Sequence, residues 1–323
     1  MFYSWVRALV GFAIRLFYRV RVSRSAPEPE GPLIYVGNHP NSLIDPALLF
    51  VISRRPVTFL AKAPLFRVPG LAQVLKGLGA LPVYRKQDDP GLMAKNEATF
   101  EVAVEALVAG KALTVFPEGR SHSEPALGEL KTGAARIALR AASRGAAVKI
   151  VPVGLTYAEK SRFRSEVAIE VGPVLEIQPP LSSTPDGDRE WVRKTTEEIA
   201  AALERVTLNL ESWEDLPLIA IAEELYALRV GEKSANPERL RGFARGLRLF
   251  RSEQPKRFEE IRAQLMAFRH RLQLSRASPR DLRLRYHRAA VYAFALRNLA
   301  VLVIGLPLAA LGIVIFAVPF SIP

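Results

Sequence analysis

The sequence contains no cysteine. This absence excludes disulfide bonds, thiolate metal sites and a cysteine nucleophile, and it leaves the redox compartment of the protein undetermined. Histidine is also scarce. The four histidines show no spacing typical of metal ligands; they are His39, His122, His270 and His287.

Basic residues outnumber acidic ones. The sequence contains 45 Lys and Arg and 32 Asp and Glu, which gives a formal net charge of +13. Such a balance suggests a polyanionic partner, either nucleic acid or an anionic membrane face. The positive charge adjoins an apolar C-terminal stretch, and no aromatic-interleaved basic strand or zinc-finger spacing occurs. We therefore expect anionic membrane lipids as partners and no nucleic acid.

Residues 32–180 alternate short apolar runs with helix-like stretches. This pattern predicts an α/β domain with a mostly parallel sheet flanked by helices. The candidate strands are Leu33–Val36, Val57–Ala61, Leu81–Tyr84, Ala112–Phe116, Ile150–Leu155 and Val167–Val171. The candidate helices lie near Pro46–Ile52, Leu92–Ala109 and Leu130–Ser143.

The most informative stretch follows the first of these strands. Gly37, Asn38 and Pro40 end the strand, so His39 is expected on a loop at its carboxyl end, where open α/β sheets place ligand sites. Asp45 begins the next helix. A carboxylate that accepts from one imidazole nitrogen fixes the tautomer and leaves the other nitrogen as a base. The alternative is structural, with the histidine capping a turn and the aspartate capping a helix.

Three further stretches lie at the ends of candidate strands. One strand ends at Arg85, and another runs into Glu118-Gly119-Arg120, which joins a carboxylate, a permissive glycine and a guanidinium on one turn. Arginines near such loops are suited to bind a phosphate group, and Lys131 could add another hydrogen-bond donor. The alternative is structural, because solvated arginines and an ordinary turn would give the same pattern. Pro152 inside Val151–Gly154 predicts that this strand lies at an edge or is bulged.

Together these stretches resemble the four ordered motifs of the glycerolipid acyltransferase family, which includes glycerol-3-phosphate and lysophosphatidic acid acyltransferases. The resemblance covers roughly residues 30 to 175 and consists of Asn38-His39 with Asp45, then Arg85, then Phe116–Gly119, then Val151–Gly154. Five residues separate the histidine from the aspartate, where the commonest pattern has four. This spacing resembles the branch that acts on glycerol-3-phosphate and dihydroxyacetone phosphate.

The resemblance implies transfer of a fatty acyl group from an acyl-CoA or acyl-carrier-protein thioester to a hydroxyl of glycerol-3-phosphate. His39 would be the general base and Asp45 would orient it, without a metal, another cofactor or a covalent intermediate. Arg85 and Arg120 would hold the acceptor phosphate. Glu118 would position the acceptor or brace its turn, with Gly119 and Lys131 completing the expected binding set. A lysophospholipid is the alternative acceptor, and a non-enzymatic protein that binds anionic lipid is the alternative class.

The remaining segments suggest a membrane. Residues 1–22 combine apolar residues with arginines and predict an interfacial amphipathic helix, although an ordinary helix packed on the domain is the alternative. Residues 185–297 predict a basic helical region, since 236–297 hold 16 Lys and Arg against 5 Asp and Glu. Residues 298–323 carry no charge and predict a transmembrane segment, with a buried core helix as the alternative. Basic residues before this segment predict an active site on the cytoplasmic face.

Overall fold

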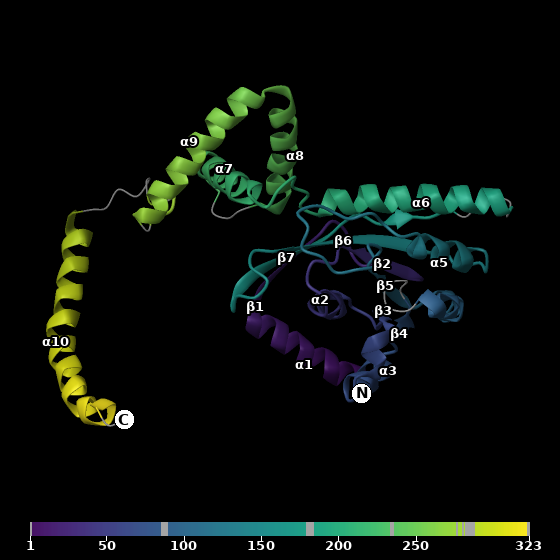
Figure 1. Ribbon diagram of the computed structural model, residues 1–323, viewed down its shortest axis with the longest axis horizontal. Helices are drawn as coiled ribbons and strands as arrows, with labels where there is room; N and C mark the ends of the chain where they lie inside the picture. Colours follow the sequence, from purple (N-terminus) through teal and green to yellow (C-terminus); the bar gives the residue numbers. More distant parts are fainter. Residues whose placement is uncertain are drawn as a thin grey trace.

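A computed structural model describes residues 2–84, 90–178, 184–232, 236–275, 277–279, 281 and 288–321 (Figure 1). Arg85 and His287 lie outside the described residues. The strands are β1 (Tyr18–Arg24), β2 (Leu33–Gly37), β3 (Val57–Lys62), β4 (Leu81–Val83), β5 (Ala112–Val115), β6 (Lys149–Tyr157), β7 (Ser165–Val171) and β8 (Leu175–Glu176). The helices are α1 (Phe2–Phe17), α2 (Ile44–Ile52), α3 (Leu71–Gly77), α4 (Asn96–Val108), α5 (Gly133–Ala142), α6 (Pro185–Val206), α7 (Asp215–Val230), α8 (Pro237–Glu253), α9 (Pro255–Leu274) and α10 (Arg288–Ser321), with short 3-10 turns at Ala63–Arg67 and Pro90–Lys95.

The strands form one sheet in the order β1-β7-β6-β2-β5-β3-β4, and β8 pairs with β6. β2 runs parallel to β5 and β6, β3 runs parallel to β4 and β5, and β1 runs parallel to β7. β6 runs antiparallel to β7 and β8. The mostly parallel α/β fold predicted from the sequence is confirmed, and all six expected strands are present.

Successive side chains of β2 point to opposite faces of the sheet, and helices cover both faces. Leu33 and Tyr35 join the cluster covered by α1 and α2, whereas Ile34 and Val36 join the cluster covered by α4, α5 and α6. A strand that is apolar at every position is typical of a sheet covered by helices on both faces. β2 is accordingly buried along its whole length and is the middle strand of the sheet.

Pro152 lies in an interior strand, so the prediction of an edge strand is wrong. On one side Lys149–Val153 of β6 pair with β2, and on the other side the partner of β6 changes from β8 at Ile150 to β7 at Val153. The carbonyl of Pro152 accepts from Gly172 N on that second side. The nitrogen of the proline therefore faces the gap between β8 and β7, where no ladder hydrogen bond is lost.

The prediction that one helix covers residues 1–22 is wrong for the C-terminal part of that range. The helix stops at Phe17, and Tyr18–Arg24 form the edge strand β1 on β7. Tyr18 is buried and Arg19 and Arg21 are exposed, so polar and apolar residues alternate with the period of a strand. This segment is part of the sheet, although the sequence pattern placed it with the preceding amphipathic helix.

The segment after residue 184 divides in two. Helix α6 packs on β6 and β2 and belongs to the α/β unit, while α7, α8 and α9 form a separate helical layer (Figure 1). Several arginines of α8 are bound by carboxylates from other elements: Arg239 pairs with Glu223, Arg241 with Glu170, and Arg251 with Asp215. These three arginines of the layer therefore help to hold α8 in place.

Helix α10 stands apart from the rest of the molecule (Figure 1). Within the described residues it holds one 20-residue stretch, Val291–Ala310, that is long and apolar enough to cross a membrane. The stretch begins before the predicted span and includes Arg297. The structure thus provides the apolar helix that the sequence predicted, and its insertion in a membrane stays a prediction.

Gly154 allows the sheet to approach α6. A Cβ built on Gly154 would lie 1.9 Å from the carbonyl oxygen of Val206, which is backbone and cannot rotate away. We predict that Gly154→Ala lowers the free energy of unfolding by about 3 kcal/mol, measured by denaturant unfolding followed by circular dichroism. Gly133→Ala is the control, because its Cβ would make only ordinary contact with Phe100. Equal stability of the two variants would contradict this account of the packing.

Candidate active site

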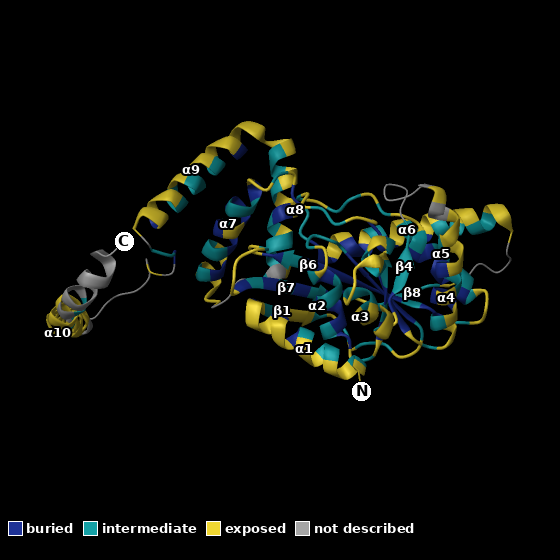
Figure 2. Ribbon diagram, turned by 60° about the horizontal axis from the view of Figure 1, so that its bottom comes forward, coloured by how far each residue is buried: buried dark blue, intermediate teal, exposed yellow. Residues whose placement is uncertain are grey.

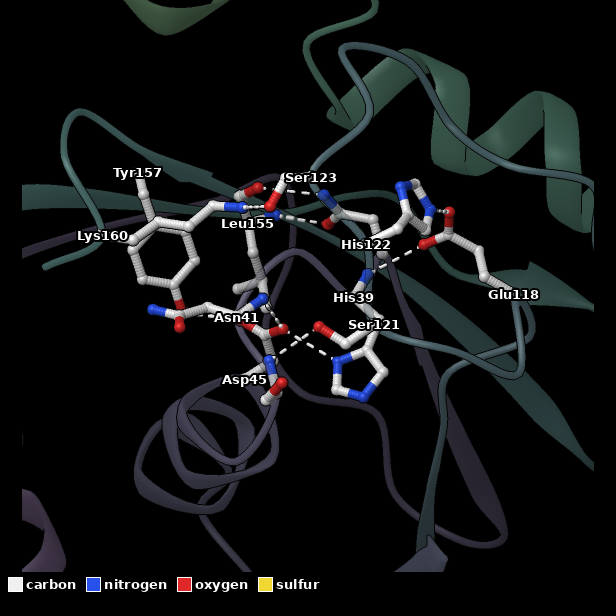
Figure 3. A network of polar contacts seen from close by, with 12 residues as sticks. His39, Asn41, Asp45, Glu118, Ser121, His122, Ser123, Leu155, Tyr157 and Lys160 are labelled. Atoms are coloured by element: carbon white, nitrogen blue, oxygen red, sulfur yellow. Dashed lines mark hydrogen bonds and ion pairs between the residues drawn. The ribbon is translucent and has the colours of Figure 1, made fainter. Parts of the chain in front are cut away.

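Three neighbouring strands end at one place. β2 leads to His39, β5 leads to Glu118, and Tyr157 is the last residue of β6 (Figure 3). These strands are parallel neighbours in the order β6-β2-β5, so their carboxyl ends lie on the same edge of the sheet. This is the edge at which open α/β sheets bind ligands.

The loop after β2 holds the His39 ring in one orientation. The Asn38 side chain donates to Leu155 O at 3.0 Å and accepts from Leu155 N at 2.7 Å, which extends the pairing of β2 with β6. The His39 ring stacks on Phe116 with ring centroids 4.3 Å apart. Phe116 in turn packs over Gly37, where a Cβ would lie only 3.1 Å from the phenyl ring. Two neighbouring strand ends therefore clamp the histidine.

Asp45 accepts three hydrogen bonds although its side chain is 0% exposed. Oδ2 lies 2.8 Å from His39 Nδ1 and accepts from Asn41 N at 2.6 Å, and Oδ1 accepts from the Tyr157 hydroxyl at 2.6 Å. An ionised carboxylate can only accept, so Nδ1 must carry the proton and Nε2 must carry a lone pair. Within the described residues Nε2 has no hydrogen-bond partner, and the His39 side chain is 18% exposed.

Tyr157 was not predicted as a site residue. Burial, and then the nearby Asp45 carboxylate, raise the pKa of its hydroxyl, so Tyr157 remains a neutral donor to Asp45. Tyr18 packs against Tyr157 with ring centroids 5.7 Å apart and accepts from Asn41 Nδ2 at 3.3 Å. Tyr157 lies 112 residues from Asp45 along the chain, so no local pattern could have revealed the contact.

Glu118 is buried and braces the site. Oε1 accepts from His39 N at 2.8 Å, and Oε2 accepts from Gly128 N at 2.8 Å and contacts His122 Nε2. His122 Nδ1 accepts from Glu124 N, so Nε2 is the protonated nitrogen. Both carboxylate oxygens are thus used within the protein. Of the two roles considered for Glu118, this geometry supports bracing rather than contact with an acceptor.

The other expected binding residues lie on or near the turn after β5. Gly119 has a φ of +70°, a conformation that favours glycine, and Arg120 is exposed on the same turn. Lys131 is exposed, lies 3.9 Å from Glu129, and donates its backbone N–H to Pro117 O at 2.7 Å. Arg120 on this turn and Lys131 beside it therefore present cations to solvent. Arg85 lies outside the described residues, so its expected role stays a prediction.

A cavity of about 430 Å³ borders this network. His39, Tyr157 and Lys160 line it from the α/β unit, and Leu216 and Leu240 line it from α7 and α8. Burial lowers the pKa of the Lys160 ammonium, which donates to Ser123 Oγ at 2.8 Å. A groove of about 930 Å³ between α5 and α6 contains neither His39, Asp45 nor Tyr157 in its walls. Among the described residues, no group of three His, Asp or Glu side chains is arranged to hold a metal ion.

Comparison with known proteins adds two findings. Residues 19–156 match a family model described as Acyltransferase. Among solved structures, the chain is similar to the crystal structure of the 1-acyl-sn-glycerophosphate (LPA) acyltransferase PlsC from Thermotoga maritima, with 21% identity and a TM-score of 0.43 over 62% of this chain and 81% of that one. No curated protein matches the sequence.

Replacing Glu118 tests its bracing role. A glutamine keeps one acceptor oxygen but turns an NH₂ group toward backbone N–H donors, so at least one buried donor loses its partner. We predict that Glu118→Gln lowers the free energy of unfolding by about 1–3 kcal/mol. Glu129→Gln is the control, because the Glu129 side chain is 90% exposed. The brace would be refuted if both variants unfolded at the same denaturant concentration.

Proposed function

We propose that the protein transfers a fatty acyl group from an acyl-CoA or acyl-carrier-protein thioester to a hydroxyl of glycerol-3-phosphate. One observation carries the proposal: the buried Asp45 carboxylate fixes His39 with its Nε2 lone pair available. The match of residues 19–156 to an acyltransferase model supports the reaction class. The His-x5-Asp spacing resembles the glycerol-3-phosphate branch and favours that acceptor.

The reaction needs a base, because a hydroxyl is a weak nucleophile at neutral pH. His39 Nε2 removes the hydroxyl proton as the oxygen attacks the thioester carbonyl, and Asp45 stabilises the imidazolium that forms. The tetrahedral intermediate then expels the thiolate, which takes the proton back from the imidazolium. The products are an ester and a free thiol, and no acyl group is attached to the protein. General base catalysis of this kind contributes about 10²–10⁴-fold to a rate.

Arg120 and Lys131 are proposed to hold the acceptor phosphate. Both are exposed, lie close to the turn that follows β5, and have no buried role that their removal would disturb. A guanidinium binds a phosphate with two parallel hydrogen bonds, which would fix the acceptor as well as attract it. Arg85 would add a third cation. The cavity beside His39 has the volume of a typical small-ligand site and would take the apolar part of a substrate.

Lysophosphatidic acid or another lysophospholipid is the second candidate acceptor. It carries the same phosphate, so the same cations would bind it. The exposed apolar face of α1 favours this candidate, because a lipid acceptor would be presented at a membrane. A third possibility, a non-enzymatic protein that binds anionic lipid, is opposed by the complete His39–Asp45–Tyr157 network.

The decisive assay is acyl transfer by detergent-purified protein from palmitoyl-CoA and from palmitoyl acyl-carrier protein to labelled acceptors. We predict transfer to glycerol-3-phosphate that falls about 10³-fold in His39→Ala. His270→Ala is the matched control, because His270 is exposed on α9, far along the chain from the site, and it should keep full activity. Transfer to the lysolipid alone would favour the second acceptor. The absence of transfer from either donor in folded protein would refute the proposal.

Tyr157→Phe tests how Asp45 is held. The variant removes one hydrogen bond to a buried carboxylate, so we predict that kcat falls ten- to a hundredfold, corresponding to about 1.5–3 kcal/mol. KM for both substrates should stay unchanged, because the hydroxyl contacts Asp45 rather than a substrate. Tyr226→Phe on the exposed side of α7 is the control. Unchanged kcat, or a higher KM alone, would show that Tyr157 does not act through Asp45.

A further inference from the structure

The helices α7 and α8 lie beside β6 and β7 (Figure 2), and the cavity of about 430 Å³ lies between them. Ala168 and Glu170 of β7 belong to its floor, and Leu216 and Leu240 belong to its roof. The roof comes from helices that follow residues 19–156, the part of the chain that matches the acyltransferase model. That match therefore gives the roof of the cavity no role.

The basic side chains of the cavity wall are of two kinds. Arg21 and Arg241 each pair with a glutamate of β7 at 3.2 Å. Among the described residues, Lys160 and Arg269 also line the cavity but form no ion pair. The paired arginines hold β1 and α8 against β7, whereas the other two leave positive charge for an external anion.

Lys160 lies where an anion would stabilise it. Its Nζ donates to Ser123 Oγ at 2.8 Å, which is a neutral partner. Burial lowers the pKa of the ammonium, and the charge of Asp45 opposes this effect only in part. A ligand anion beside a partly buried cation favours the charged form of that cation. His39 lines the same cavity, so an anionic ligand there would lie against the proposed base.

One substrate of the proposed reaction still lacks a site for its negative charge. The acceptor phosphate is proposed to bind Arg120 and Lys131, and neither residue lines this cavity. Acyl-CoA and acyl-carrier protein both carry the acyl group on a phosphopantetheine arm, with the thioester at one end and a phosphate at the other. Building on the proposed function, we propose that the cavity holds this arm, with its phosphate on Lys160 and Arg269 and its thioester at His39.

The chemistry of the walls favours the arm over the fatty acyl chain. Leu216 and Leu240 offer apolar surface to the methyl groups of the arm, and Thr156 offers a hydroxyl to its amides. A hydrocarbon chain in the same place would cover the Arg241–Glu170 ion pair and remove it from water. The arm is a mixed ligand, and the cavity has mixed walls.

The phosphate contact is tested by calorimetric titration of the full chain in detergent with 4′-phosphopantetheine and with pantetheine. We expect the phosphate to lower Kd about a hundredfold in the unmodified protein and about tenfold in Lys160→Met or Arg269→Met, because each cation supplies a charge-assisted hydrogen bond. Arg271→Met is the matched control, since Arg271 is exposed on α9 and does not line the cavity. An equal gain from the phosphate in all four proteins, or no binding of phosphopantetheine, would overturn the proposal.

The position of the arm is tested by filling the cavity. Ala220 is exposed on α7 and lines the cavity, so Ala220→Trp should block it without disturbing the core. We expect Kd for 4′-phosphopantetheine to rise about tenfold or more, with an unchanged circular dichroism spectrum. Ala263→Trp on the exposed side of α9 is the control and should bind normally. Normal binding by Ala220→Trp would place the arm elsewhere and overturn the proposal.

CoA and holo-acyl-carrier protein, titrated separately, distinguish the two sources of the arm. Weaker binding to Lys160→Met of either one supports the proposal and identifies the carrier, whereas unchanged binding of both overturns it. These titrations need no acyl transfer. Failure of the proposed function would appear as binding without transfer, and failure of this inference would appear as transfer with binding that Lys160→Met leaves unchanged.

Discussion

The structure depends on one buried charge, the carboxylate of Asp45. Burying a carboxylate without partners costs several kcal/mol, so the ionised form persists only where donors surround it. Asn41 N, the Tyr157 hydroxyl and His39 Nδ1 supply those donors from the loop after β2 and the end of β6. The charge of Asp45 therefore fixes the geometry of the loop and the tautomer of His39 at the same time, which joins folding to the proposed chemistry.

Much of this arrangement follows from local sequence. The runs Leu33–Val36 and Ala112–Phe116 predict buried strands because nearly every position is apolar, with Thr114 the exception. The breakers at Gly37 and Pro40 predict where the chain leaves the sheet. The carboxyl ends of parallel strands lie at the same edge of a sheet. The sequence alone therefore predicts that His39, Asp45 and Glu118 lie at one edge. The resemblance to acyltransferases adds an order of motifs, which single residues would not provide.

Other features depend on contacts that are distant in sequence. Tyr157 is an ordinary strand residue until Asp45 is brought to it, and Glu118 becomes a brace only when His39 N, Gly128 N and His122 converge on it. The sequence pattern predicts helix where β1 forms, because the short alternating run Tyr18–Arg24 directly follows an amphipathic helix. Arginines of α8 suggested an external polyanion, yet carboxylates of Glu223 and Glu170 from other elements bind two of them.

The most direct measurement of the central claim is the ¹⁵N NMR spectrum of the protein labelled at its four histidines. The His39 signals would be assigned by their loss in His39→Gln. If Asp45 fixes the ring as described, the neutral His39 will carry its proton on Nδ1, and Nε2 will show the chemical shift of an unprotonated nitrogen. A proton on Nε2 of the neutral ring would contradict the account, because that nitrogen could then not serve as the base.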